Sequence, residues 1–144
     1  MSLFSVLSIS ASGMSAQRAR AELLTENLAN AETTRTPEGG PYRRKDAVFE
    51  SSTVESPFTS EFRSQLEEPG GVAVSEIVVD QRAPELRYMP GHPDANADGY
   101  VAFPRVSPAE DMVDLMGAAR SYQANVAAIS AIKDMIQRSL DLFR

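Results

Sequence analysis

The chain has 144 residues, of which 42% are hydrophobic and 24% charged, and a net charge of −6. This length allows one ordinary domain, or a small domain with long helical extensions, and the composition is that of a folded protein. Cysteine is absent, which excludes disulfides, thiol catalysis and thiolate metal sites. Because the middle of the chain carries most of the negative charge, a nucleic-acid surface is not expected.

An apolar repeat with alternating steps of three and four residues predicts a helix from residue 3 to residues 29–31. Gly13 lies inside it at a cost of about 1 kcal/mol relative to alanine, either as a tolerated defect or as a point of close approach. Two prolines and a glycine pair after residue 36 cannot continue the helix. The seam positions expected to pack against other helices are Leu3, Leu7, Met14, Ala21, Leu24 and Leu28.

All nine prolines fall between residues 37 and 108, so the segment 32–106 is expected to form a separate, β-rich middle domain. A small antiparallel sheet is expected there, interrupted by a polar excursion over residues 51–67. The runs that predict its strands are residues 46–50, 72–79, 85–89 and 99–103.

The second long helix is predicted to begin after Ser107, because Ser107-Pro108-Ala109-Glu110 has the residues of a capping box with proline at the first helical position. The chain is therefore predicted to be α+β, with terminal helical segments 1–31 and 107–144 packed in a coiled-coil-like core. The second helix repeats the three–four spacing, and its expected packing positions are Met112, Leu115, Ala119, Val126, Ile129, Ile136 and Leu140.

The apolar seams of the two helices are expected to need more contacts than one chain provides. Both helices carry further apolar groups off the seam, such as Ile9 and Met116, so pairing with each other leaves apolar surface. We expect helices of other chains to cover it, and the termini to become fully ordered on assembly. A self-contained helical hairpin packed on the sheet is the alternative.

No catalytic, cofactor or metal site is expected. The single histidine, His92, lies in a Pro-Gly-His-Pro turn, with no partners for a catalytic triad or a zinc site. Residues 94–99 match half of a calcium-binding EF-hand loop, but Arg105 stands where the loop needs glutamate, so a hydrogen-bonded turn is expected. The basic run at residues 43–45 is expected on a solvated strand edge, or against an acidic neighbour.

Several strings resemble those of the bacterial flagellar rod and hook axial proteins. Residues 10–17 (SASGMSAQ) and 26–34 (ENLANAETT) resemble the opening helix of that family, and residues 119–126 (ARSYQANV) its closing helix. Residues 36–45 (TPEGGPYRRK) and 91–101 (GHPDANADGYV) resemble stretches typical of one rod member. The match also includes side chains expected to make polar contacts that fix the register between subunits, namely Asn27, Asn30, Tyr122, Gln123 and Asn125.

The resemblance implies a structural subunit of the proximal rod, the torque-transmitting shaft that crosses the periplasm between the flagellar motor and the hook. It implies export by the flagellar type III apparatus without a cleavable signal peptide, which agrees with the absence of a signal-like or membrane-spanning run. The implied partners are further copies, rod proteins of the FlgB, FlgF and FlgG types, and the adapter to the motor ring. The rival hypotheses are a soluble binding module with a helical dimer handle, and an enzyme at the acidic turn around Asp98.

Overall fold

The structure is a computed structural model that describes residues 3–52 and 70–142. The described part of the chain consists of two long terminal helices with four strands between them, which confirms the predicted α+β class. The helices and strands in chain order are α1 (Leu3–Ala29), β1 (Lys45–Ser52), β2 (Gly71–Val79), β3 (Glu85–Tyr88), β4 (Tyr100–Phe103) and α2 (Pro108–Asp141).

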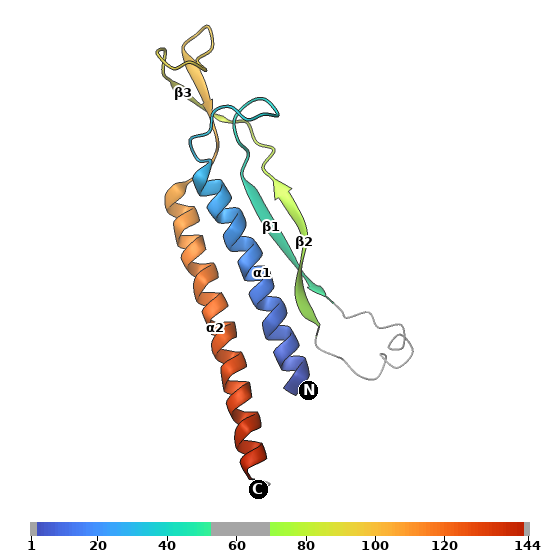
Figure 1. The fold of residues 1–144 in the computed structure, drawn as a ribbon. Coiled ribbons are helices and arrows are strands. Elements are labelled where there is room, and N and C mark those ends of the chain that lie inside the picture. The colour runs from blue at the N-terminus through green and yellow to red at the C-terminus, as the bar shows by residue number, and fades with distance from the viewer. Residues whose placement is uncertain (1–2, 53–69, 143–144) are drawn as a thin grey trace, which may run out of the picture.

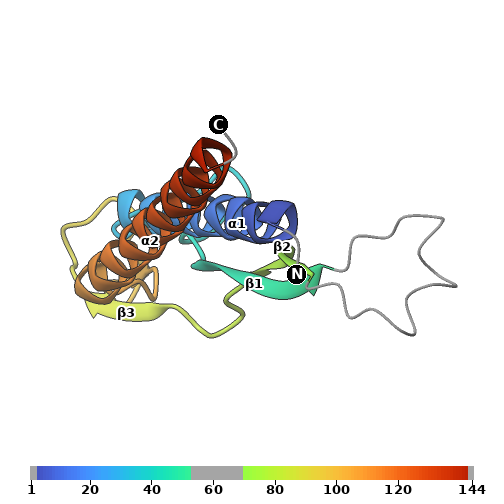
Figure 2. The same cartoon turned by 90° about the horizontal axis from the view of Figure 1, so that it is seen from below.

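The two helices are antiparallel, and α1 lies between α2 and the β1–β2 hairpin (Figures 1 and 2). Among the described elements, α2 packs only against α1. It has 34 residues against 27 in α1, and its last turns extend beyond the first turn of α1 (Figure 1). Within one chain the two helices therefore pair as a hairpin packed on strands, but much of α2 has no partner among the described residues, so the self-contained hairpin of the alternative is not what the contacts show.

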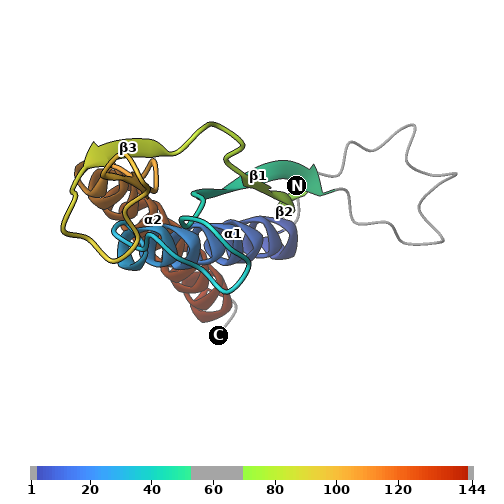
Figure 3. The same cartoon turned by 90° about the horizontal axis from the view of Figure 1, so that it is seen from above.

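The strands form two separate two-stranded antiparallel sheets, so the expected single sheet is wrong. β1 pairs with β2, and β3 pairs with β4 near the end where α1 stops and α2 begins (Figures 1 and 3). The chain leaves the first ladder in a tight turn, where the Asp80 carboxylate accepts a hydrogen bond from the Arg82 N–H at 2.9 Å. Pro84 follows, and because proline has no N–H it cannot extend the ladder.

The polar excursion begins later than predicted. Ser51 and Ser52 belong to β1, because they pair with Val72 and Gly71 of β2. The remainder of that predicted excursion lies within residues 53–69, outside the described residues. The helix start is where the sequence placed it: Ser107 is the N-cap of α2 and Pro108 follows, although the Ser107 side chain makes no capping hydrogen bond.

The hydrophobic core is small for a chain of this length. Seven apolar residues of the described part are buried, and two of them are alanines: Ala16, Leu24, Tyr42, Val101, Phe103, Ala118 and Ile132. Sixteen large apolar side chains in the same part are exposed, and eight of these belong to α2 or follow it directly. Within residues 3–52 and 70–142, more large apolar side chains are exposed than buried, which is unusual for a self-sufficient domain.

Candidate assembly interface

One buried side chain joins the end of α1 to the start of β1. Asn27 is 0% exposed, and its Oδ1 accepts hydrogen bonds from the Lys45 N–H and the Tyr42 hydroxyl, both at 2.9 Å. Its Nδ2 donates to the Lys45 carbonyl at 2.8 Å. Burial, with the nearby Glu26 carboxylate, raises the pKa of Tyr42 to about 12, so the phenol stays protonated and donates. Asn27 therefore fixes how the hairpin leaves α1.

The loop after α1 is shaped to bring Tyr42 back to Asn27. Gly39 and Gly40 have φ of 91° and 80°, a region that side chains with a Cβ rarely adopt. The Thr36 N–H donates to the Gly40 carbonyl at 2.9 Å, and the Tyr42 N–H donates to the Thr33 carbonyl at 3.0 Å. The glycine pair thus reverses the chain, so that Tyr42 faces the last turns of α1.

A buried ion pair ties the start of α2 to the segment before β1. Arg44 Nη2 lies 3.0 Å from Oδ1 of Asp111, whose side chain is fully buried, and Arg44 Nε lies 3.3 Å from Asp46. The pair lacks hydrogen-bond geometry, and neither Asp111 oxygen accepts a hydrogen bond from a described residue. Burial raises the pKa of Asp111, and the Arg44 charge opposes that rise. The prediction of a solvated strand edge is wrong for Arg44, because its partner arrives from α2.

The contact between the helices is close because small residues line it. The close approach considered for Gly13 is confirmed, since a Cβ there would lie 3.1 Å from Nδ2 of Asn125 on α2. Further along, Arg20 Nη2 lies 3.8 Å from Asp114, which links the two helices near the start of α2. On α2 the positions turned toward this contact are spaced by seven residues, which is the period of a coiled-coil seam: Asp111, Ala118, Asn125 and Ile132.

The structure places the predicted packing positions in three environments. Leu24 is buried. Seven others are half-buried, namely Leu7, Met14, Ala21, Leu28, Leu115, Ile129 and Ile136. Four positions on α2 are exposed, namely Met112, Ala119, Val126 and Leu140. The side chain of Leu3 lies outside the described residues. The expected role of these positions in packing between subunits stays a prediction. The four exposed positions are those that no described part of the same chain buries.

The α2 helix thus carries two adjacent stripes of residues, one that contacts α1 and one that is exposed. The inner stripe, which contains Asp111 and Ala118, faces α1. The outer stripe, which contains the predicted positions Met112 and Ala119, lies one residue further along the sequence. Sequence reasoning missed the inner stripe because it contains few large apolar residues. Its signal in the sequence is a seven-residue spacing of mostly small or polar side chains, together with a glycine on the opposing helix. The outer stripe, with Met112 53% and Leu140 60% exposed, remains available to another molecule.

The polar side chains of the family match lie in different places. Asn30 Nδ2 donates to the Glu26 carbonyl at 2.9 Å, and its Oδ1 accepts from the Thr33 hydroxyl at 3.1 Å. Tyr122 and Gln123 are exposed on α2, whereas Asn125 is half-buried against Gly13. The contribution of these side chains and Asn27 to register between subunits stays a prediction.

At the far end of the molecule, residues 94–99 form the expected hydrogen-bonded turn. Asn96 Oδ1 accepts from the N–H groups of Asp98 and Tyr100, at 3.0 and 2.8 Å. His92 Nδ1 accepts from the Asp94 N–H at 3.1 Å. Within residues 3–52 and 70–142, no group of three or more acidic, histidine or cysteine side chains is arranged to hold a metal ion.

Neither α1 nor α2, within the residues described, combines the length and hydropathy needed to cross a bilayer.

Comparison with known proteins identifies similar chains. Residues 97–142 match the family described as flagellar basal body rod FlgEFG protein C-terminal. Over 99% of both chains, the sequence is 43% identical to the flagellar basal-body rod protein FlgC of Bacillus subtilis. It is 37% identical to the FlgC proteins of Borreliella burgdorferi, over 100% of this chain and 99% of the relative, and of Salmonella typhimurium, over 99% and 98%.

Proposed function

Because the chain belongs to the FlgC family of flagellar basal-body rod proteins, we propose that it enters the rod through the outer stripe of α2, with α1 and the hairpin behind it. The chain is a structural rod subunit of the flagellar basal body, and other rod components are its partners. The observation that carries the proposal is the run of large apolar side chains on α2 that no described element covers.

The energetics favour a protein partner for this stripe. Met112, Val126 and Leu140 are each at least 42% exposed. Transferring a side chain of this kind from water into a packed interface stabilises the assembly by about 1.5–3 kcal/mol when burial is complete. The contribution is spread along a helix of 34 residues, or roughly 50 Å at about 1.5 Å per residue. Many weak contacts over such a length resist shear without one dominant bond.

The finer part of the proposal concerns place and neighbours. We assign the chain to the proximal rod in the periplasm, reached through the flagellar type III export apparatus, where it transmits torque from motor to hook. Its neighbours there are further copies, FlgB-, FlgF- and FlgG-type rod proteins, and the adapter to the motor ring. A head-to-tail contact between the outer stripe of α2 and a different surface of the next subunit would propagate as a helix of subunits. The protein is proposed to work without catalysis.

A charge placed in the outer stripe tests this proposal. Val126→Lys should prevent incorporation into the rod, because a lysine in a dehydrated interface lacks a partner. The matched control is Ala127→Lys, which adds the same charge to an exposed position one residue on, about 100° around the helix. Each variant would replace the wild-type chain in a motile cell, and swimming and the amount of subunit in purified basal bodies would be measured. Normal assembly of Val126→Lys would contradict the proposal.

A further inference from the structure

The small sheet of β3 and β4 has an apolar face that is exposed to water. In its ladder Leu86 lies opposite Ala102, and the next pair on the same face is Tyr88 with Tyr100. Leu86 is 62% exposed, Tyr88 66% and Tyr100 42%. The water-facing side of an antiparallel sheet normally carries polar side chains. We call these four residues the β3–β4 face.

The other side of the same sheet contains its buried residues. Val101 is 0% exposed and Phe103 8%. The Arg87 guanidinium lies on this side, 4.8 Å from the centre of the Phe103 ring, and Arg87 bonds Glu85 at 3.1 Å. Among the described helices and strands, β3 and β4 contact only each other. The β3–β4 face is therefore an apolar surface that no described element covers, which is typical of an interaction site.

The two tyrosines of the β3–β4 face hold each other in place. Their rings pack edge to face, with centroids 5.3 Å apart and planes at 64°. Gly99 has a φ of 81°, and a Cβ there would lie 2.9 Å from the Tyr88 ring, so this ring rests directly on the backbone. Neither hydroxyl bonds a described residue. A rigid, exposed tyrosine pair has the chemistry of the residues that dominate protein interfaces.

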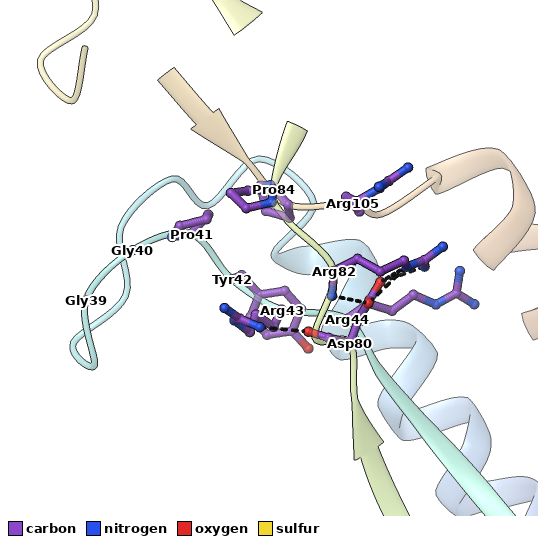
Figure 4. A pocket seen from close by; sticks show the side chains of 11 residues that line it. Gly39, Gly40, Pro41, Tyr42, Arg43, Arg44, Asp80, Arg82, Pro84 and Arg105 are labelled. Carbon is purple, nitrogen blue, oxygen red and sulfur yellow. Dashed lines mark hydrogen bonds and ion pairs between the residues drawn. The ribbon is translucent and has the colours of Figure 1, made fainter. Parts of the chain in front are cut away.

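Two contacts fix the sheet to the rest of the molecule. In the turn between β2 and β3, Arg82 Nη2 donates to the Asp80 carboxylate at 2.6 Å (Figure 4). The Thr34 hydroxyl, in the loop after α1, donates to Asp94 in the turn between β3 and β4 at 2.8 Å. The β3–β4 face therefore has a defined position, at the end of the molecule where α2 begins (Figures 1 and 3).

The second half of α2 offers a complementary surface at the opposite end (Figure 1). Its outer stripe carries Val126, 42% exposed, and Leu140, 60% exposed. Lys133 lies between them, is exposed, and makes no hydrogen bond or ion pair with a described residue. Three other charged side chains of this half lie about 80–140° around the helix from Lys133, at about 100° per residue: Asp134, Arg138 and Asp141. The stripe itself thus presents one cation among apolar groups.

We propose that the β3–β4 face of one copy receives the second half of the outer α2 stripe of the next copy, with Lys133 paired to Asp98. This inference rests on the proposed function and names the surface that the head-to-tail contact uses. Asp98 is exposed in the turn directly before β4, and its carboxylate bonds no described residue. The apolar stem of a lysine can lie along tyrosine rings while its ammonium group reaches a carboxylate at their edge.

Position and charge select a second copy as the occupant. The two surfaces lie at opposite ends of the molecule, so one chain cannot bring its own together (Figure 1). A contact between two different surfaces of identical copies extends from copy to copy instead of closing as a pair. Sliding by one helical turn, about 5.4 Å, would separate the Lys133 ammonium from the Asp98 carboxylate within an apolar contact. The pair therefore gives the contact a single register.

Exchange of the two charges tests this contact. In motile cells, Lys133→Glu and Asp98→Lys should each lower the amount of subunit in purified basal bodies roughly tenfold or more, because like charges would meet. The double variant should restore it. Lys133→Glu combined with Glu38→Lys is the matched control, because it has the same net charge but places the lysine in the exposed loop after α1. It should stay defective, whereas Arg138→Glu, outside the stripe, should assemble like the wild type.

Normal incorporation of either single variant would overturn the proposal. Failure of the double variant to assemble would also overturn it, by placing a different protein against one of the two surfaces. If Val126→Lys fails to assemble while both single variants assemble normally, this contact is wrong and the rod assignment stands. In thermal melting of the purified full-length chain, both single variants should match the wild type. A clearly lower melting temperature for either would overturn the proposal by giving that side chain a structural role within one chain.

Discussion

Replacing Asn27 by alanine is expected to destabilise the folded chain more than replacing Asn30, the next asparagine along the chain. The side chain makes three hydrogen bonds of 2.8–2.9 Å, two to the backbone of Lys45 and one to Tyr42. Alanine would leave the Lys45 N–H, the Lys45 carbonyl and the Tyr42 hydroxyl without their partner. Each buried polar group left unsatisfied costs about 1–3 kcal/mol.

The magnitude follows from how accessible each abandoned group is. Tyr42 is buried, so its hydroxyl bears the full cost, whereas Lys45 is half-buried and its backbone can recover part of its bonding from water. We therefore expect Asn27→Ala to lower the free energy of unfolding by about 2–5 kcal/mol. Asn30→Ala is the control, because Asn30 is half-buried and bonds only near itself in the chain, to Glu26 and Thr33. It should cost about 0.5–1.5 kcal/mol.

The assay is urea unfolding of the purified full-length chain, followed by circular dichroism at one protein concentration. The midpoint for Asn27→Ala should lie well below that for Asn30→Ala, with similar slopes if both unfold from the same native state. Equal midpoints for the two variants would refute the argument that Asn27 holds the hairpin to α1.

Three further predictions concern the same contacts. The free energy of unfolding of Gly13→Ala should lie within about 1 kcal/mol of the wild type, because better helix propensity offsets the 3.1 Å approach to Asn125. Gly13→Leu should lower the free energy of unfolding, measured in urea, by about 1–3 kcal/mol. Arg44→Met should lower the free energy of unfolding by about 3–5 kcal/mol, because it leaves the fully buried carboxylate of Asp111 without this ion pair. Asp111→Asn should destabilise the chain less. Equal shifts in the melting temperatures of the two variants would contradict this. Burial raises the pKa of Tyr42 from 10.0 to about 12. The stabilisation by the neutral phenol should therefore be complete below pH 10 and be lost as the pH rises toward 12. In unfolding measured at alkaline pH, Tyr42→Phe should not show this loss.

The helices and strands could be predicted because their signals are local. The predicted helix ends near residues 3, 29 and 107 are within two residues of the observed bounds, since apolar spacing and the Ser107-Pro108 pair act over a few residues. The division into two sheets could not be predicted. It depends on which strands pair, and on a turn around Asp80 whose hydrogen bonds are not visible in residue type.

The polar junction was only partly predictable for a related reason. The family resemblance points to Asn27, but its partners Tyr42 and Lys45 are brought to it by a loop whose path depends on two glycines with positive φ. The sequence predicts a solvated Arg44, because a basic run before a strand is usually exposed. Its burial follows from Asp111, which lies in a different helix and becomes a neighbour only in the folded chain.

Polar contacts within the chain and the exposed apolar surface of α2 suit two different tasks, namely fixing the fold of the subunit and joining it to its neighbours. Directional hydrogen bonds and an ion pair at Asn27, Arg44 and Asp111 fix the angles among α1, α2 and the hairpin, because such bonds tolerate little displacement. The outer stripe of α2 is mostly apolar, with Lys133 between Val126 and Leu140. Apolar burial is non-directional, so alone it would allow neighbouring subunits to slide along the helix. A rod needs one register at every joint. Polar contacts between subunits would have to supply the directional element that the apolar surface lacks.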